Sequence, residues 1–264
     1  MTQESTDKGF AAAAGAVSIH VIRTDAEGLE TGFATLPGGA PAYYARPEHG
    51  RNLPVVLLAE EIFGLHEHIR DVARRLAKLG LFVIAPDYLA RYGDPMTAPD
   101  IDAIRAIVAK VPDVETMGVF DEALAFVEGK GGDVDHAAIT GFCWGGRIAW
   151  LYAAHNPRLA ACIPWYGRLD GARTKEQPRW PIDVASEIKV QTLGLYGGDD
   201  PSIPYDLILT MKDKLAEAGA PADIILYDQA PHGFFADYRP SYRERDAHDA
   251  WGRMVAFLRA QGVG

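Results

Sequence analysis

The chain has 264 residues, of which 48% are hydrophobic and 23% charged, which suits one domain with a substantial core and excludes a disordered chain. Its net charge of −10 argues against nucleic-acid and anionic-membrane partners, because both are polyanions. No apolar run could span a bilayer and the start MTQESTDKG lacks a basic leader, so we expect neither a membrane span nor a signal peptide. Two cysteines cannot form a disulfide framework, which favours free thiols and a cytoplasmic location.

Residues 1–40 are rich in Gly, Ala and Thr and include one strand-like patch, Val17–Ile22, so we predict an N-terminal extension or early edge strands there. From residue 41 to 264, apolar runs alternate with amphipathic stretches, which predicts a single domain. In chain order, the predicted elements are a strand at 54–59, a helix at 69–76 that ends at Gly80, a strand at 81–85, a helix at 120–127, strands at 137–140, 159–163 and 190–196, a helix at 207–215, a strand at 224–227 and a last helix at 247–258.

This repeated alternation of strands and helices predicts an α/β fold, with a mostly parallel central sheet and helices on both of its faces. In such sheets the chemistry gathers at the carboxyl ends of the strands, so we expect the functional motifs there. The polar, proline-bearing stretch 170–186 is predicted to be a plain surface loop, with a flap over the site as the alternative.

A nucleophile motif follows the predicted strand HAAIT and precedes the predicted helix RIAWLYAA. The residues Gly141-Phe142-Cys143-Trp144-Gly145 fit the pattern G-x-nucleophile-x-G, in which a Cβ at either flanking glycine would clash in the tight strand-to-helix turn. The following helix N-terminus carries partial positive charge that favours thiolate over thiol. We therefore predict that Cys143 is a nucleophile; the alternative, a small buried apolar residue, is what we expect of Cys162.

An acid and a histidine follow Cys143 in the order that α/β-hydrolases use. His232 lies in the loop DQAPHG just past the strand at 224–227, whereas His248 falls on the polar side of the last helix. The acid should lie in the loop GGDDP after the preceding strand, where Asp199 and Asp200 fit equally well on spacing alone. Its task would be to accept a hydrogen bond from the imidazole and orient the ring.

Such a triad attacks an ester or lactone carbonyl with a thiolate and forms a thioester that water then hydrolyses. The backbone N–H of Trp144 would donate to the developing oxyanion, and a second donor should come from the loop after the strand at 54–59. We expect no metal and no cofactor, because neither the His66–His68 pair nor the isolated cysteines match a zinc spacing, and no phosphate-binding loop is present.

Together these motifs resemble the dienelactone hydrolase family (carboxymethylenebutenolidases) of the α/β-hydrolase superfamily. The resemblance covers most of the chain, from about Pro54 to the C-terminal helix. The residues that carry it are Glu61-Ile62-Phe63-Gly64 after the first strand, Pro86-Asp87 and Arg91, the elbow G-F-C-W-G-G, the spacing Gly197, Asp200, Ile203 and Pro204, and the loop histidine His232.

The resemblance selects Asp200 over Asp199 and Glu61 over Glu60 as active-site residues, and it implies that the N–H of Ile62 is the second oxyanion donor. In this family the cysteine rests neutral, paired with the glutamate, until bound substrate moves the glutamate away and the thiolate forms beside the histidine. By this resemblance Glu61 is the modulator of the thiol.

Characterised enzymes of the family bind the carboxylate of a dienelactone with arginines, one of which lies four residues beyond the histidine. That position is Ala236 in this chain, and the candidate replacements are Arg91, Arg147 and Arg239. We therefore predict a cofactor-free cysteine hydrolase whose partner is a small lactone or ester. One alternative is a general carboxylesterase or thioesterase; another, from a different class, is a non-catalytic ligand-binding or sensing protein on the same fold.

Overall fold

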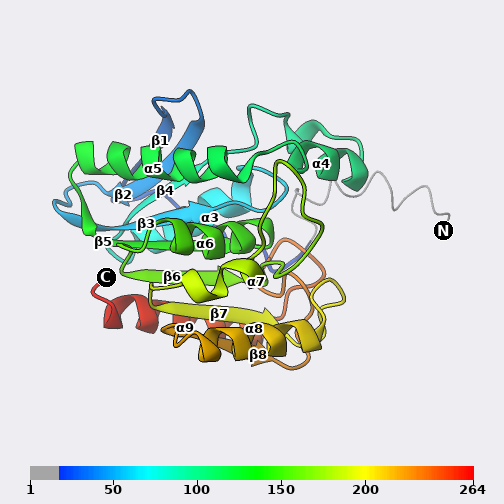
Figure 1. Cartoon of the computed structure of the whole chain (residues 1–264). Helices are drawn as coiled ribbons and strands as arrows, with labels where there is room; N and C mark the ends of the chain where they lie inside the picture. The colour runs from blue at the N-terminus through cyan, green and yellow to red at the C-terminus, as the bar shows by residue number, and fades with distance from the viewer. Residues whose placement is uncertain (1–17) are drawn as a thin grey trace.

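The computed structural model describes residues 18–264 and contains an eight-stranded sheet in the order β1-β2-β4-β3-β5-β6-β7-β8 (Figure 1). The antiparallel pairs β1/β2 and β2/β4 form one edge, and the pairs from β4 through β3 to β8 are parallel. The strands are β1 Leu29–Thr35, β2 Pro41–Pro47, β3 Leu53–Ala59, β4 Phe82–Pro86, β5 Gly132–Phe142, β6 Ala161–Trp165, β7 Thr192–Gly197 and β8 Ala222–Tyr227.

Helices cover both faces of this sheet, with α5 and α6 on one face and α3 and α9 on the other (Figure 1). The predicted α/β class with a mostly parallel sheet is therefore confirmed. The helices are α3 Glu67–Ala77, α4 Ile101–Val108, α5 Asp113–Gly129, α6 Trp144–His155, α7 Pro181–Val184, α8 Tyr205–Glu217 and α9 Glu244–Ala260, with short 3₁₀ turns at Pro95–Thr97 and Ala185–Glu187.

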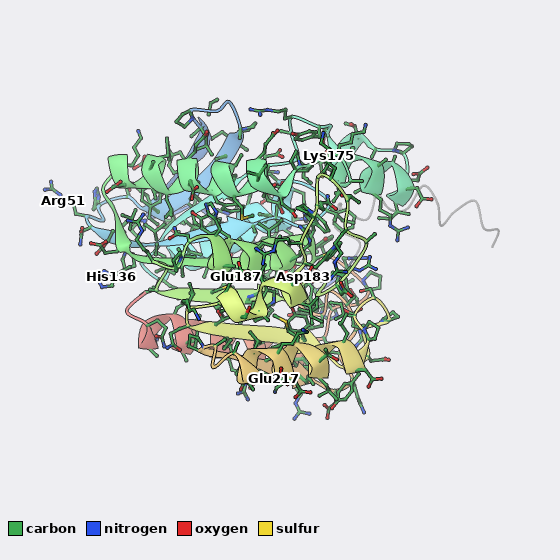
Figure 2. All side chains as sticks on the ribbon, in the orientation of Figure 1. Arg51, His136, Lys175, Asp183, Glu187 and Glu217 are labelled. Atoms are coloured by element: carbon green, nitrogen blue, oxygen red, sulfur yellow. The ribbon has the colours of Figure 1, made fainter. Side chains whose placement is uncertain are left out.

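The central strands are buried on both faces, which explains their continuous apolar sequences. Residues 55–59 of β3 and 83–85 of β4 are completely inaccessible to solvent, as expected for parallel strands that lie between two layers of helices. Charged side chains such as Arg51, Lys175 and Glu217 lie on the outer surface (Figure 2). No helix within residues 18–264 combines the length and apolar character needed to cross a bilayer.

The predicted strand at Val17–Ile22 is not formed over residues 18–22, whereas residues 1–17 lie outside the described part of the chain. Side chains of α3 bind the chain just beyond it, at Thr24. The backbone N–H of Thr24 donates to Asp71 Oδ1 (2.5 Å), and Arg74 Nε donates to the carbonyl of Thr24 (2.7 Å). These two bonds fasten the start of the described chain to α3.

The parallel arrangement brings the ends of β3, β5, β6, β7 and β8 to one side of the sheet. The loops after β7 and β8 are joined directly there: Gly198 N donates to the carbonyl of Tyr227 (2.9 Å), and Asp199 N donates to that of Ala230 (3.1 Å). These two bonds hold the loop that contains Asp200 against the loop that contains His232.

Candidate active site

Cys143 occupies a sharp turn between β5 and α6. Its backbone has φ 54° and ψ −114°, a conformation that costs a residue other than glycine about 1–3 kcal/mol. A Cβ at Gly141 would lie 2.3 Å from the carbonyl oxygen of Gly145, and one at Gly145 would lie 2.2 Å from that of Ala59. Both flanking positions therefore require glycine, and the sulfur is presented at the N-terminus of α6.

Asp200 and His232 form a direct pair, in which His232 Nδ1 lies 2.7 Å from Asp200 Oδ2. The second carboxylate oxygen accepts hydrogen bonds from the hydroxyl (2.6 Å) and the backbone N–H (2.8 Å) of Ser202. Burial alone would raise the pKa of Asp200, but the hydrogen bond and charge of His232 and the bonds from Ser202 outweigh it and lower the pKa. Asp199 is exposed, so the structure brings only Asp200 to the histidine.

His232 also contacts Cys143. Burial opposes the charged imidazole, but the negative charge of Cys143 and hydrogen bonds with Asp200 and Cys143 raise the pKa of His232 to about 10. Because Nδ1 is paired with Asp200, Nε2 is the atom available to the sulfur. These surroundings thus favour the protonated imidazole of His232.

Tyr166 is a residue of this site that the sequence interpretation missed. It follows β6 with φ 35°, its ring meets the His232 ring edge-on at a centroid distance of 5.2 Å, and its hydroxyl is buried without a hydrogen-bond partner among the described residues. A tyrosine just past a strand that ends beside the elbow is the only sequence signal that could have indicated it. Ser202 was missed as well, although it lies two residues beyond Asp200.

The two predicted oxyanion donors lie at the same place. Ile62 and Trp144 both line the cavity that contains Cys143 and His232. Within residues 18–264, the backbone N–H groups of Ile62 and Trp144 have no hydrogen-bond acceptor in the protein. Two open donors beside a nucleophile are what a developing oxyanion needs.

The cavity around Cys143 has a volume of about 540 Å³ and mostly apolar walls. Three arginines also line it, namely Arg105, Arg168 and Arg239. The segment 170–186, expected to be a plain surface loop, contributes Ala172, Thr174, Gln177 and Trp180 to the wall, so this expectation was wrong. Its apolar side chains cover the site because Trp180 is buried against Trp144.

Of the three arginines predicted to bind substrate, only Arg239 lines the cavity. Arg91 lies outside it, where it bonds to Glu115 (3.3 Å) and to the carbonyl of Gly38 (2.6 Å). Arg147 is completely buried and bonds to both carboxylate oxygens of Asp113 (2.6 and 2.8 Å).

The structure therefore corrects the predictions for Arg91 and Arg147. The guanidinium of Arg147 lies between the rings of Trp144 (4.5 Å) and Trp180 (4.4 Å), where it supports the cavity wall and cannot reach a ligand. Arg168 follows β6 directly and could have been inferred from that position. Arg105 lies on α4, a helix that the sequence interpretation did not predict.

The adjacent carboxylates Glu60 and Glu61 are both fully buried at the end of β3 but have different surroundings. Burial and the charge of Asp87 raise the pKa of Glu60 well above its usual value. Glu61 Oε2 instead lies 2.7 Å from the hydroxyl of Tyr238 and 3.2 Å from His66 Nε2. No hydrogen bond joins Glu61 to Cys143 in the described part of the chain.

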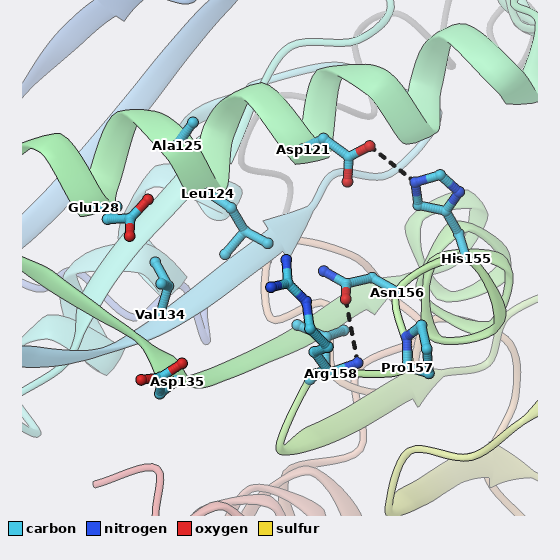
Figure 3. A pocket seen from close by; sticks show the side chains of 11 residues that line it. Asp121, Leu124, Ala125, Glu128, Val134, Asp135, His155, Asn156, Pro157 and Arg158 are labelled. Atoms are coloured by element: carbon cyan, nitrogen blue, oxygen red, sulfur yellow. Dashed lines mark hydrogen bonds and ion pairs between the residues drawn. The ribbon is translucent and has the colours of Figure 1, made fainter.

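A second hollow, of about 530 Å³, lies at the opposite ends of the strands, between α5, the start of β5 and the end of α6 (Figure 3). It contains another histidine–aspartate pair, His155 Nε2 and Asp121 Oδ2, at 2.9 Å. None of the predicted catalytic residues lines it. Within residues 18–264, no cluster of three or more His, Cys, Asp or Glu side chains is arranged to hold a metal ion.

The chain is similar to known proteins over most of its length. The model of the dienelactone hydrolase family matches residues 40–262. A protein of Escherichia coli K12 named "Putative carboxymethylenebutenolidase" is 46% identical to this chain. The alignment covers 99% of this chain and 97% of that protein. A protein of the same name from Methylorubrum extorquens is 49% identical, and the alignment covers 97% of this chain and 90% of that protein.

Among solved structures, one described as a putative dienelactone hydrolase from Klebsiella pneumoniae superposes with a TM-score of 0.85 and is 46% identical. The superposition covers 88% of this chain and 98% of that one. A dienelactone hydrolase-like promiscuous phosphotriesterase from metagenomic libraries has a TM-score of 0.72 at 20% identity, which shows similarity of fold alone.

Proposed function

The chain belongs to the dienelactone hydrolase family and is a hydrolase that acts on ester bonds, and from this premise we propose that it cleaves a lactone or ester through a thioester on Cys143. The observation that carries the proposal is the contact of Cys143, on its strained turn, with a histidine that Asp200 orients. Because the chain is a hydrolase, we do not retain the alternative of a non-catalytic binding protein.

In the proposed reaction, the Cys143 thiolate attacks the carbonyl carbon and the electron pair moves to the carbonyl oxygen. The N–H groups of Ile62 and Trp144 stabilise this oxyanion. The intermediate collapses to a thioester while His232 Nε2–H protonates the departing oxygen. His232 then takes a proton from water, which attacks the thioester and releases the acid and the Cys143 thiolate. Asp200 keeps the imidazole in the required tautomer throughout.

The lining of the cavity supports a small substrate with an apolar body and an anionic group. Ile62, Phe63 and Trp144 supply apolar surface beside the sulfur, and Arg105, Arg168 and Arg239 supply positive charge. A lactone with a carboxylate, of the kind after which the relatives are named, fits this description.

We also propose a cytoplasmic location, which the two free cysteines support.

Trapping the acyl-enzyme tests this mechanism. Rapid acid quench during turnover of an activated ester, followed by intact-mass and peptide analysis, should show an acyl group on Cys143. Cys143→Ala should abolish both the adduct and steady-state hydrolysis. The matched control is Cys162→Ala, which removes a fully buried thiol on β6 and should retain both. Wild-type turnover by Cys143→Ala would refute the nucleophile assignment.

A general carboxylesterase or thioesterase remains the second candidate, and the burial of Ala236 favours it. That position, where characterised relatives have an arginine, is completely inaccessible here and has no room for one. A panel of dienelactones and neutral esters, assayed with Arg168→Gln and Arg239→Gln, separates the two candidates. Selective loss of activity on the anionic substrates supports the lactonase. Equal rates on neutral esters in all variants, with little activity on dienelactones, support the general esterase.

A further inference from the structure

Two segments far apart in the sequence converge on one carboxylate oxygen of Glu61. Tyr238, six residues after the catalytic histidine, donates its hydroxyl to Glu61 Oε2 (2.7 Å), and His66, at the start of α3, places Nε2 3.2 Å from the same oxygen. All three residues are almost completely buried. We call His66 and Tyr238 the Glu61 clamp.

The protonation of this cluster suits a carboxylate that is held firmly. Burial favours the neutral acid, but the hydrogen bond and charge of His66, followed by the charges of His68 and Arg239, lower the pKa of Glu61 to about 2. Burial lowers the pKa of His66, against the hydrogen bond and charge of Glu61. The His66 ring stacks on His68, which is bonded to Asp237 (3.2 Å). The clamp is therefore part of a larger buried network.

The clamp leaves the other carboxylate oxygen of Glu61 without a partner among the described residues. Among the described residues, Glu61 Oε1 and the Tyr166 hydroxyl are both buried without hydrogen-bond partners. After burial itself, the charges of Glu61 and Cys143 raise the pKa of Tyr166. A Glu61 freed from the clamp would have Tyr166 and the Cys143 thiol as new partners.

We propose that His66 and Tyr238 are positioning residues, which hold Glu61 away from Cys143 so that the thiol can pass its proton to His232 Nε2 before substrate binds. This inference rests on the proposed role of Cys143 as nucleophile. A carboxylate beside the sulfur would accept the S–H hydrogen bond and repel a thiolate, so its removal favours ionisation. The thiol of this enzyme would then be active without a substrate that displaces the glutamate, in contrast to the substrate-triggered activation implied by the family resemblance.

The rate at which iodoacetamide alkylates Cys143 in the unliganded enzyme, measured from pH 5 to 10, tests the clamp. Tyr238→Phe should slow alkylation at pH 7 about tenfold and move the inflection of the pH profile upward, because the freed carboxylate stabilises the thiol. In a Glu61→Gln background the same substitution should change the rate less than about twofold, since no carboxylate remains to move. The matched control is Tyr152→Phe, which removes a hydroxyl bonded to Asp121 on α5, remote from Glu61.

Equal slowing by Tyr238→Phe in both backgrounds, or no slowing in either, would overturn the clamp. A second pair of variants covers the case in which Tyr238→Phe does not fold: His66→Gln keeps an N–H donor and should retain the alkylation rate, whereas His66→Leu should slow it. Identical behaviour of these two variants contradicts the proposal. Failure of the clamp would leave the acyl group on Cys143 unaffected, whereas failure of the proposed function would appear as turnover by Cys143→Ala, so the two failures are distinguishable.

Discussion

Two histidine–aspartate pairs lie near the two ends of α6, in hollows of about 540 and 530 Å³. His232 and Asp200 are 2.7 Å apart beside the start of the helix, and His155 and Asp121 are 2.9 Å apart at its end. Their surroundings differ greatly. The Asp200 side chain is 1% exposed, against 49% for Asp121, and only the first pair has a thiol on a strained turn beside it.

The comparison shows that a histidine–aspartate distance does not by itself define a catalytic site. At the start of α6 the unpaired N–H groups stabilise negative charge on Cys143, whereas the end of the helix has the opposite polarity. Burial also shields the Asp200 carboxylate from water, which strengthens its interaction with His232. We expect substitutions at the buried pair to abolish activity and the same substitutions at the exposed pair to be silent.

The largest expected difference is between the two histidines. His232→Gln should lower kcat roughly 10³–10⁴-fold, because it removes both the partner of the thiolate and the proton donor to the leaving group. His155→Gln should keep kcat within about twofold, since its side chain is 42% exposed and touches no substrate. Steady-state hydrolysis of an activated ester measures both. Comparable losses in the two variants would mean that the second hollow takes part in the reaction.

The two aspartates should differ next most. Asp200→Asn should reduce kcat about 10²-fold with little change in KM, because an amide can bind the imidazole in the wrong tautomer. Asp121→Asn should leave kcat unchanged within about twofold, because an exposed pair contributes little. Both kinetic constants should be measured with folding checked by circular dichroism. An Asp200→Asn enzyme with normal kcat would refute the role of Asp200.

The charge of Cys143 should account for much of the protonation of His232. The pKa of His232 is about 10, and the negative charge of Cys143 is the first of the causes that raise it. Cys143→Ala should therefore lower this pKa by at least about one unit, or about 1.4 kcal/mol. Because the pKa in the folded wild type lies well above the ordinary histidine value of 6.5, the imidazole should stay protonated at pH 8.

Titration of the ring protons of His232 by NMR measures this pKa. Cys162→Ala is the control for loss of a thiol elsewhere, because Cys162 is buried on β6 away from the cavity lining. An unchanged His232 pKa in Cys143→Ala would show that Asp200 alone sets it.

The smallest expected effect is that of Ser202, whose hydroxyl bonds to Asp200 as the Tyr152 hydroxyl bonds to Asp121 in the exposed pair. Ser202→Ala removes the hydroxyl that donates to Asp200 Oδ1 but keeps the backbone bond to the same oxygen, so we expect about a threefold loss in kcat. Ser186→Ala, in an exposed turn after α7, provides the control. No loss in Ser202→Ala would indicate that the backbone bond alone positions Asp200.

Much of the fold could be predicted because its signals are local. The continuous apolar sequences of β3 and β4 reflect burial of both faces of these strands. The periodic apolar positions of α3 and α9 reflect burial of one face of each helix. The segment at 17–22 misled the interpretation because its short apolar pattern suits a strand. Whether a strand forms depends on a neighbouring strand, and residues 18–22 pair with none in the sheet.

The candidate site also contains a part that local sequence could predict and a part that depends on tertiary contacts. Its elbow was recognisable because glycine–cysteine–glycine spacing reflects a steric requirement within a few residues. The arginines were mostly misassigned, since the sequence does not state that Arg147 lies between two tryptophans or that Arg168 lines the cavity. Tyr166, Ser202 and the clamp residues were missed because they act through contacts in space.

By itself, the sequence determined the α/β class, the turn that presents Cys143 and the chain order of Cys143, the acidic loop and His232. These features depend on periodicity, turn sterics and chain order, which operate over neighbouring residues. Only the tertiary structure decided that Asp200 reaches His232, that Arg147 is buried against Asp113, and that Glu61 is held by Tyr238, 177 residues away. Such choices depend on which side chains share a buried volume, and that volume exists only once distant loops have packed together.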